Sequence, residues 1–251
     1  MRKRLSIGSW VGMVVLGLTT LGFSQKIQVS NPPSNNVMDG IYVGSYSATN
    51  VSTGGSMQII CDDFNDNTNY NASSYTTNTF SSLGNTMWGS YMMNTQHSSM
   101  SQVTQLYDEV VWLSEAMVNL TGTQQGNYSY AIWAIFAPNS VAQWLTWHND
   151  SSACNAVFGN GSWGWGGCNA GKGGLVGLAS SQNYSGFNTS NVLILTPTGC
   201  SWPGFCGQQE FIEIVAAEGG SSALYLLLAA SACFAAIFFR SRRRAGFAQP
   251  V

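Results

Sequence analysis

The sequence predicts an α+β fold. We expect a single extracellular domain in which terminal β-strands surround a central helical segment, followed by a single C-terminal transmembrane helix. Three observations carry this prediction. Apolar and polar residues alternate near both ends of the domain, over 41–48 and 209–215, as in strands. Between them, apolar residues recur at the spacing of one helix face over 101–120. Finally, 221–239 carries no charge and is long enough to cross the ~30 Å hydrocarbon core of a bilayer as a helix.

Residues 1–24 predict a secretory signal peptide. Arg2, Lys3 and Arg4 form a positively charged start, and an apolar stretch follows over 10–18. Small residues near Ser24 suit cleavage by a signal peptidase, which is therefore an expected partner. Removal of this leader leaves an extracellular domain over 25–217 and a tail over 218–251.

The charge distribution excludes one class of partner. Charged residues make up 8% of the 251 residues, against about a quarter in ordinary soluble proteins. All 11 acidic residues lie between Gln25 and Gly219, together with only Lys26 and Lys172 of the 9 basic ones. Binding to phosphates requires clustered Lys and Arg, so nucleic acid is not an expected partner. The polarity comes instead from Asn, Ser, Thr, Gln and Gly, a mixture common in secreted surface proteins.

The strands of the domain are predicted by alternation between turn-rich stretches. The polar stretch 25–39 is read as an extended leading segment, and the turn at 50–55 joins the first two strands into a hairpin. The Asn- and Ser-rich loop that follows is expected to hold one edge strand. The predicted strands are 41–48, 56–62, 74–80, 191–196 and 209–215.

The helices are predicted by apolar stripes and by caps. The stripe through Val103, Leu106 and Val110 has Ser99 or Ser101 as its N-cap. A short, nearly all-apolar run before Pro138 predicts a buried helix. The stretch 149–174 is read as a loop bracketed by cysteines. The predicted helices are 101–120, 128–136, 140–148 and 174–182.

The cysteines suit an oxidising compartment. Cys154 and Cys168 flank a Gly- and Trp-rich loop, and a bridge between them would close roughly fifteen residues, worth about 3 kcal/mol. Cys200 and Cys206 flank a tight turn. We expect these two local disulfides, although four cysteines allow three connectivities. Cys61 is left over. It is interpreted as a buried apolar residue, with a reactive thiol or another disulfide as the alternatives.

The end of the chain combines an acidic-glycine motif, an apolar run and an arginine cluster. The motif is Glu218-Gly219-Gly220, and the cluster is Arg240, Arg242, Arg243 and Arg244. This order resembles the PEP-CTERM sorting tail, which exosortase-type membrane enzymes of Gram-negative bacteria recognise. The usual motif of that family is Pro-Glu-Pro, whereas this chain is closer to a Glu-Gly-Gly variant. A plain single-pass anchor, with the arginines on the cytoplasmic side, is the alternative.

The resemblance implies where the protein acts. It implies an exosortase-like partner, transient anchoring in the membrane through the C-terminal helix, and release to the cell surface or extracellular matrix. There the protein would have a structural or binding role among the exopolysaccharides of a biofilm. No cofactor and no enzymatic activity are expected. A secreted hydrolase using Asp108, Glu109 or Glu115 is a less favoured alternative.

Two segments of the body resemble, more distantly, the thioester domains of Gram-positive surface adhesins. They are the segment around Cys61-Asp62 and the Ala-Ile-Trp run that ends at Trp133. In that family a Cys bonds to the Gln of a Gln-x-Ala-Ile-Trp motif. Cys61 matches the Cys, but Ser129 stands where the Gln would be. The resemblance therefore implies an adhesin-like scaffold without the thioester chemistry.

Two further groups of residues are candidate binding sites. Trp163, Trp165 and Trp202 lie in glycine-rich loops, where exposed indoles stack on sugar rings or pack over disulfides. The oxygen-rich run of Asp62, Asp63, Asn65 and Asp66 is a weak candidate for Ca²⁺, and an Asx-rich turn is the preferred interpretation.

Overall fold

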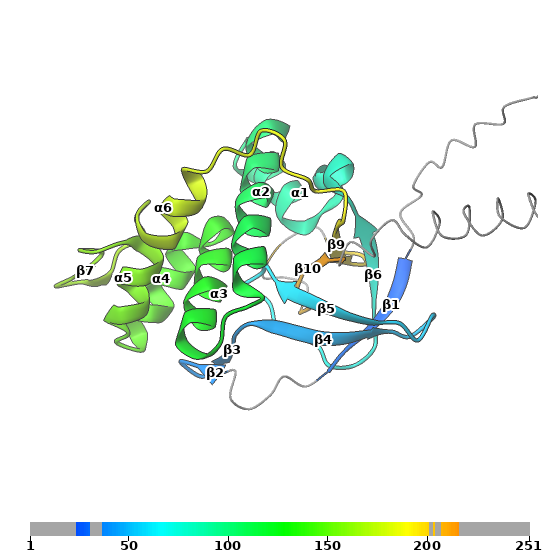
Figure 1. Cartoon of the computed structure of the whole chain (residues 1–251), viewed down its shortest axis with the longest axis horizontal. Coiled ribbons are helices and arrows are strands. Elements are labelled where there is room, and N and C mark those ends of the chain that lie inside the picture. Colours follow the sequence, from blue (N-terminus) through cyan, green and yellow to red (C-terminus); the bar gives the residue numbers. More distant parts are fainter. Residues whose placement is uncertain (1–23, 31–36, 201–202, 204–206, 216–251) are drawn as a thin grey trace, which may run out of the picture.

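The centre of the molecule is a closed barrel of six antiparallel strands in the order β1-β4-β5-β10-β9-β6 (Figure 1). The structure is a computed structural model that describes residues 24–30, 37–200, 203 and 207–215. Because β1 pairs with both β4 and β6, every barrel strand has two neighbours, which removes the exposed edges of an open sheet. The strands are β1 (Ser24–Val29), β4 (Ser45–Asn50), β5 (Ser56–Cys61), β6 (Ser73–Asn78), β9 (Val192–Pro197) and β10 (Phe211–Ile214).

Aromatic side chains fill the inside of the barrel. Alternate residues of each strand point inward, and Tyr46, Tyr75 and Phe211 meet there. The ring of Phe211 lies 5.9 Å from that of Tyr46 and 6.0 Å from that of Tyr75. All three side chains are buried.

The outward face of three neighbouring strands is buried as well. Ile60, Ile212 and Ile194 are register partners on β5, β10 and β9, and each is almost fully buried. A barrel face that carries apolar residues outward must pack on another layer. The helices form that layer, and the inner and outer apolar residues belong to one continuous core.

The helical layer is built around α2 and α3, which pack on each other (Figure 1). Ser99 and Gln102 form a capping box at the start of α2. Pro138 occupies the first turn of α4, where its missing N–H costs nothing. The helices are η1 (Phe80–Asn85), α1 (Met87–Thr95), α2 (Met100–Met117), α3 (Gly122–Phe136), α4 (Pro138–Trp147), α5 (Ser151–Phe158) and α6 (Gly174–Ser180).

Two small hairpins project from this body. One pairs β2 (Val37–Met38) with β3 (Ile41–Tyr42), and the other pairs β7 (Trp163–Gly164) with β8 (Gly167–Cys168). Both lie on the side of the molecule away from β1 and β6 (Figure 1). They frame the surfaces considered below.

The predicted fold class is wrong in its architecture. The fold is α+β, but the terminal strands do not simply flank a helical segment; they close a six-stranded barrel. Closure depends on β1, in a stretch interpreted as an extended leading segment. It also depends on β6, which was expected at a sheet edge but pairs on both sides with β1 and β9.

The transmembrane part of the predicted fold class is also not shown. Within the described ranges, no helix combines the length and the apolar character needed to cross a membrane. The segment 221–239, on which the prediction rested, lies outside those ranges.

Several local predictions need correction. The strand expected at 41–48 is interrupted by Gly44, which has a φ of 93° and divides it into β3 and β4. A Cβ on Gly44 would lie 2.7 Å from the Gln125 side chain, so α3 approaches too closely for any other residue. The stretch expected to be a loop at 149–174 contains α5, capped by Asp150. Helix α1 was not predicted at all.

Candidate functional site

The predicted disulfide between Cys154 and Cys168 is confirmed, and it fixes the β7–β8 hairpin to α5. The hairpin is also tied to α4, because the Cys168 N–H donates a hydrogen bond to Thr146 Oγ1 at 2.8 Å. At Gly167, where φ is 101°, a Cβ would lie 2.3 Å from the Thr146 side chain. The hairpin is therefore held rigidly against the helical layer.

Trp165 is displayed at the tip of this hairpin. Its relative exposure is 110%, whereas Trp163 on β7 is half-buried and packs against the core. Trp147, at the end of the adjoining helix α4, is 69% exposed. A fully solvated indole contributes nothing to the packing of the domain, so its position is typical of a contact surface. The remaining predicted glycan contact, Trp202, lies outside the described residues.

A second surface feature is a pocket of about 390 Å³ with aromatic walls, which we call the aromatic pocket. It lies between the β2–β3 hairpin, the loop after β5, and helices α3 and α4. Phe64 and Trp133 pack with ring centroids 5.4 Å apart, and Phe64 and Trp144 at 5.9 Å. The aromatic lining residues are Tyr42, Tyr46, Phe64, Tyr70, Trp133 and Trp144.

The β2–β3 hairpin is positioned over the aromatic pocket by α3. The turn residue Asp39 has a φ of 52°, and its Oδ2 accepts a hydrogen bond from the Tyr130 hydroxyl at 2.9 Å. Gly126 makes room for Met38, whose Sδ would lie 2.3 Å from a Cβ at that position. These contacts hold Tyr42 at the rim, where it is 41% exposed.

The loop after β5 forms the floor of the aromatic pocket and is held by Gln209. The Gln209 Nε2 donates to the backbone oxygens of Asp63 at 3.0 Å and Asp66 at 2.8 Å, and Thr68 donates to Gln209 Oε1. The Asp66 carboxylate accepts from the Gly207 N–H at 3.0 Å. The loop is therefore prearranged by residues far away in the sequence.

Asp63 is the buried acid of this floor. Its Oδ1 accepts from the Asn65 N–H at 2.9 Å, while Oδ2 is shielded from solvent and has no hydrogen-bond partner among the described residues. Burial, together with the neighbouring charge of Asp66, raises the pKa of Asp63 to about 8. The side chain is therefore mostly protonated at neutral pH.

The Asn65–Asp63 bond is the expected Asx turn. Among the described residues, no group of three or more His, Cys, Asp and Glu side chains is arranged to hold a metal ion. The acids of the oxygen-rich run lie in two different environments. Asp63 and Asp66 line the aromatic pocket, whereas Asp62 lies near Glu210.

Glu210 is the centre of a buried network that joins the barrel to the helices. Its Oε1 lies 2.7 Å from the Tyr107 hydroxyl of α2, and its Oε2 accepts from the Met87 N–H of α1 and the Thr196 hydroxyl of β9, each at 2.6 Å. We call these four residues the Glu210 network. Asp62 is fully buried nearby, and neither of its carboxyl oxygens has a hydrogen-bond partner among the described residues. Burial, and then the charge of Glu210, raises the pKa of Asp62 well above its usual range.

Cys61 has the surroundings of an unreactive thiol. It faces the barrel interior, is buried, and donates through Sγ to the Asp63 carbonyl at 3.0 Å. Burial raises the pKa of the thiol well above its usual value, so little thiolate forms near neutral pH. Ser129, at the position of the thioester Gln, accepts a hydrogen bond from Gly44 at 2.7 Å instead.

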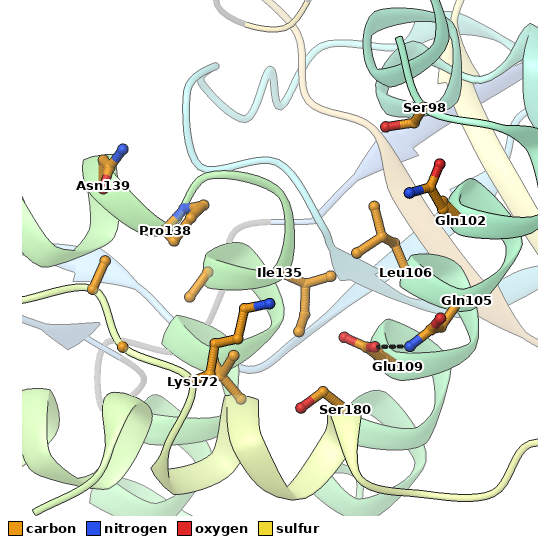
Figure 2. Close-up of a pocket in the computed structure, with 14 residues that line it drawn as sticks. Ser98, Gln102, Gln105, Leu106, Glu109, Ile135, Pro138, Asn139, Lys172 and Ser180 are labelled. Carbon is orange, nitrogen blue, oxygen red and sulfur yellow. Dashed lines mark hydrogen bonds between the residues drawn. The ribbon is translucent and has the colours of Figure 1, made fainter. Parts of the chain in front are cut away.

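A groove of about 680 Å³ runs along the helical layer between α2, the start of α4 and α6. Figure 2 shows Lys172 and Glu109 on facing sides of the groove, with Ile135 between them. Gln105 donates a hydrogen bond to Glu109 at 3.1 Å. Glu109 is buried, and burial raises its pKa despite that bond and the charge of Lys172. As a charged residue of the amphipathic helix predicted at 101–120, Glu109 was expected on its outer face, and its burial shows that this expectation is wrong.

Several predicted sites lie outside the described residues. They include the sorting motif Glu218-Gly219-Gly220 and the cluster Arg240, Arg242, Arg243 and Arg244. Cys200 is described and takes part in a disulfide. Cys206, its predicted partner, lies outside the described residues.

The aromatic pocket and the Glu210 network were both missed by sequence reasoning. Trp133 and Trp144 were considered only as parts of the helices predicted at 128–136 and 140–148, and the run from Asp62 to Asp66 as an Asx-rich turn. One feature of the sequence could have indicated the Glu210 network. Within the strand predicted at 209–215, the acid Glu210 stands directly before apolar residues. Comparison with family models, with curated proteins and with solved structures finds no match to this chain.

Proposed function

We propose that this chain is an exported, non-enzymatic protein of the bacterial surface or extracellular matrix that binds exopolysaccharide. The observation that carries the proposal is Trp165, fully exposed at the tip of a hairpin that a disulfide holds in place. The flat face of an indole suits the apolar face of a sugar ring, and its N–H donates to a hydroxyl. A rigid hairpin loses little conformational entropy on binding, which favours affinity.

The surface chemistry supports an uncharged polymer as the ligand. Five acidic side chains, Asp62, Asp63, Asp66, Glu109 and Glu210, are buried and contribute little to the outer surface. The outer surface is instead rich in amides and hydroxyls, which both donate to and accept from sugar hydroxyls. The disulfide suits an oxidising location outside the cytoplasm.

The proposed route to the surface rests on the two ends of the sequence. The leader is proposed to be removed by a signal peptidase, and an exosortase-like enzyme to recognise Glu218-Gly219-Gly220 ahead of the arginine cluster. In protein recovered from the source bacterium, we expect an intact mass that ends near Glu218. A mass that still includes Val251 would contradict sorting by such an enzyme, without bearing on polysaccharide binding.

Trp165→Ala is expected to weaken binding to fragments of the exopolysaccharide of the source bacterium by about five- to tenfold. The loss of a stacking face removes about 1–1.5 kcal/mol, and a factor of ten corresponds to about 1.4 kcal/mol. Stability should change by less than about 0.5 kcal/mol, because the side chain makes no contribution to the core. Calorimetric titration of the oxidised protein with short, monovalent fragments measures the affinity.

The matched control is Leu178→Ala, which removes another exposed apolar side chain, 53% exposed, from α6. This variant should bind like the wild type. Equal affinities of the wild type and Trp165→Ala would overturn the proposed contact. Loss of binding in both variants would indicate non-specific adhesion through exposed apolar side chains and would contradict a specific contact at Trp165.

A further inference from the structure

The aromatic pocket has the walls of a site for a ring-shaped ligand. Phe64, Trp133 and Trp144 form a tilted, edge-to-face cluster on one side, and Tyr42 and Tyr70 come from other segments. Its volume of about 390 Å³ lies at the small end of ligand pockets, which span about 300–1,000 Å³. A pocket of this size suits one or two rings and excludes a long chain.

The polar groups of the aromatic pocket select against charged ligands. Asn67 and Thr68 supply an amide and a hydroxyl group at its edge, and none of its described lining residues is Lys, Arg or His. A carboxylate or phosphate would find no cation to pair with, while Asp66 would repel it. Asp63 adds no full charge at neutral pH, since burial raises its pKa to about 8. An uncharged ligand rich in hydroxyls fits these groups.

Two buried polar atoms of residues that line the aromatic pocket, Asp63 Oδ2 and Trp144 Nε1, lack a hydrogen-bond partner among the described residues. Asp63 Oδ2 is buried without a hydrogen bond among the described residues, in a side chain with no exposed area. Leaving a buried polar atom unpaired costs stability. Because this oxygen is shielded from solvent, the Asp63 side chain must shift toward the aromatic pocket before a hydroxyl group of a ligand can pair with it. The surrounding loop is already fixed by Gln209, so the group is presented without rearrangement of the backbone.

We propose that the aromatic pocket binds a single uncharged pyranose ring, packed between Tyr42 and Trp144 with a hydroxyl group directed to Asp63. The inference rests on the proposed polysaccharide binding and extends it. Trp165 would contact the polymer on the outside, while the aromatic pocket takes one terminal or branch ring and so sets which sugar is recognised.

The test uses methyl glycosides of glucose, galactose, mannose and N-acetylglucosamine as probes, with NMR of the full oxidised chain as the readout. We expect one of them to shift the indole N–H resonances of Trp133 and Trp144 in a saturable way, and to leave that of Trp165 in place. Tyr42→Ala, which removes a rim side chain that is 41% exposed, should weaken this binding at least tenfold. Trp165→Ala should leave it unchanged.

The outcomes separate this inference from the proposed function. If no glycoside shifts the two indoles at any accessible concentration, or if Tyr42→Ala binds as tightly as the wild type, the assignment of the aromatic pocket is overturned. That result leaves polymer binding through Trp165 standing. Asp63→Asn keeps the shape and the neutrality of the side chain. If this variant binds the sugar within about threefold of the wild type while Tyr42→Ala does not, the assignment of the aromatic pocket is supported.

Discussion

Lowering the pH from 8 to 5 is expected to increase the free energy of unfolding of this domain, whereas most proteins lose stability on acidification. The reason is that burial raises the pKa of several carboxyl groups and no described group has the opposite shift. Asp62, Asp63, Glu109 and Glu210 are all raised, and Asp63 reaches about 8 from its ordinary value of 3.8. Each of these groups therefore binds its proton more tightly in the folded state.

The direction follows from proton linkage. Between pH 4 and pH 8 the folded chain keeps a proton on Asp63 that the unfolded chain has released, so unfolding releases protons and stability falls as pH rises. The contribution is fully present below the unfolded pKa of 3.8 and is lost as pH rises through about 8. Each pKa unit corresponds to about 1.4 kcal/mol, so Asp63 alone changes the unfolding free energy by roughly 4 kcal/mol between pH 8 and pH 5.

Urea unfolding of the oxidised protein at pH 5, 6.5 and 8 measures this effect. Asp63→Asn should reduce the pH dependence by the share of Asp63, since an amide keeps the bond from Asn65 but does not titrate. Glu115→Gln changes an exposed acid of α2 and should leave the profile as it is. A wild-type midpoint that stays constant or falls between pH 8 and pH 5 would contradict the argument.

The sequence predicted elements whose signals are local. The stripe through Val103, Leu106 and Val110 and the cap at Ser99 defined α2, and the short spacing of Cys154 and Cys168 indicated their disulfide. The periodicity of apolar residues and the spacing of cysteines depend only on residues that are close together in the sequence. Both can therefore be read without knowing the tertiary structure. The β4–β5 hairpin was predicted for the same reason.

The elements that were missed lack such local signals. Helix α1 has only 9 residues, with Gly89 in its first turn, and its apolar residues Trp88, Tyr91 and Met92 cover little more than one turn. Helix α5 has only 8 residues within a glycine-rich region. Strand β1 is short and follows the predicted leader, and only its pairing with both β4 and β6 shows that it closes the barrel.

The candidate sites were hidden because they depend on contacts between distant residues. Gln209 reaches Asp63 across 146 positions, and Glu210 reaches Met87 across 123. In the sequence, the acids from Asp62 to Asp66 have the composition of a solvated turn, and only the tertiary packing buries them. Trp165 was a candidate glycan contact because it lies in a glycine-rich loop, with packing over a disulfide as the alternative, and its side chain is fully exposed in the structure.

Glu210→Ala is expected to destabilise the domain by about 3–5 kcal/mol, because buried donors lose their acceptor, at about 1–3 kcal/mol each, and a cavity is left. The substitution leaves the Met87 N–H and the Thr196 hydroxyl without their acceptor and opens a cavity between barrel and helices, while the Tyr107 hydroxyl keeps its hydrogen bond to Thr86 Oγ1. Part of the loss is offset because Asp62 no longer faces a second acid. For a domain of this size the melting temperature should fall by roughly 10 °C.

The control and the coupling experiment decide whether the network is responsible. Glu213→Ala removes a half-buried acid from β10, the strand that follows Glu210, and should cost less than about 1 kcal/mol. Tyr107→Phe removes one hydrogen bond to Glu210 and should cost about 1–3 kcal/mol alone, but little in the Glu210→Ala background. Additive losses would show that Tyr107 and Glu210 act independently. An effect of Glu210→Ala no larger than that of Glu213→Ala would mean that apolar packing alone joins the helices to the barrel.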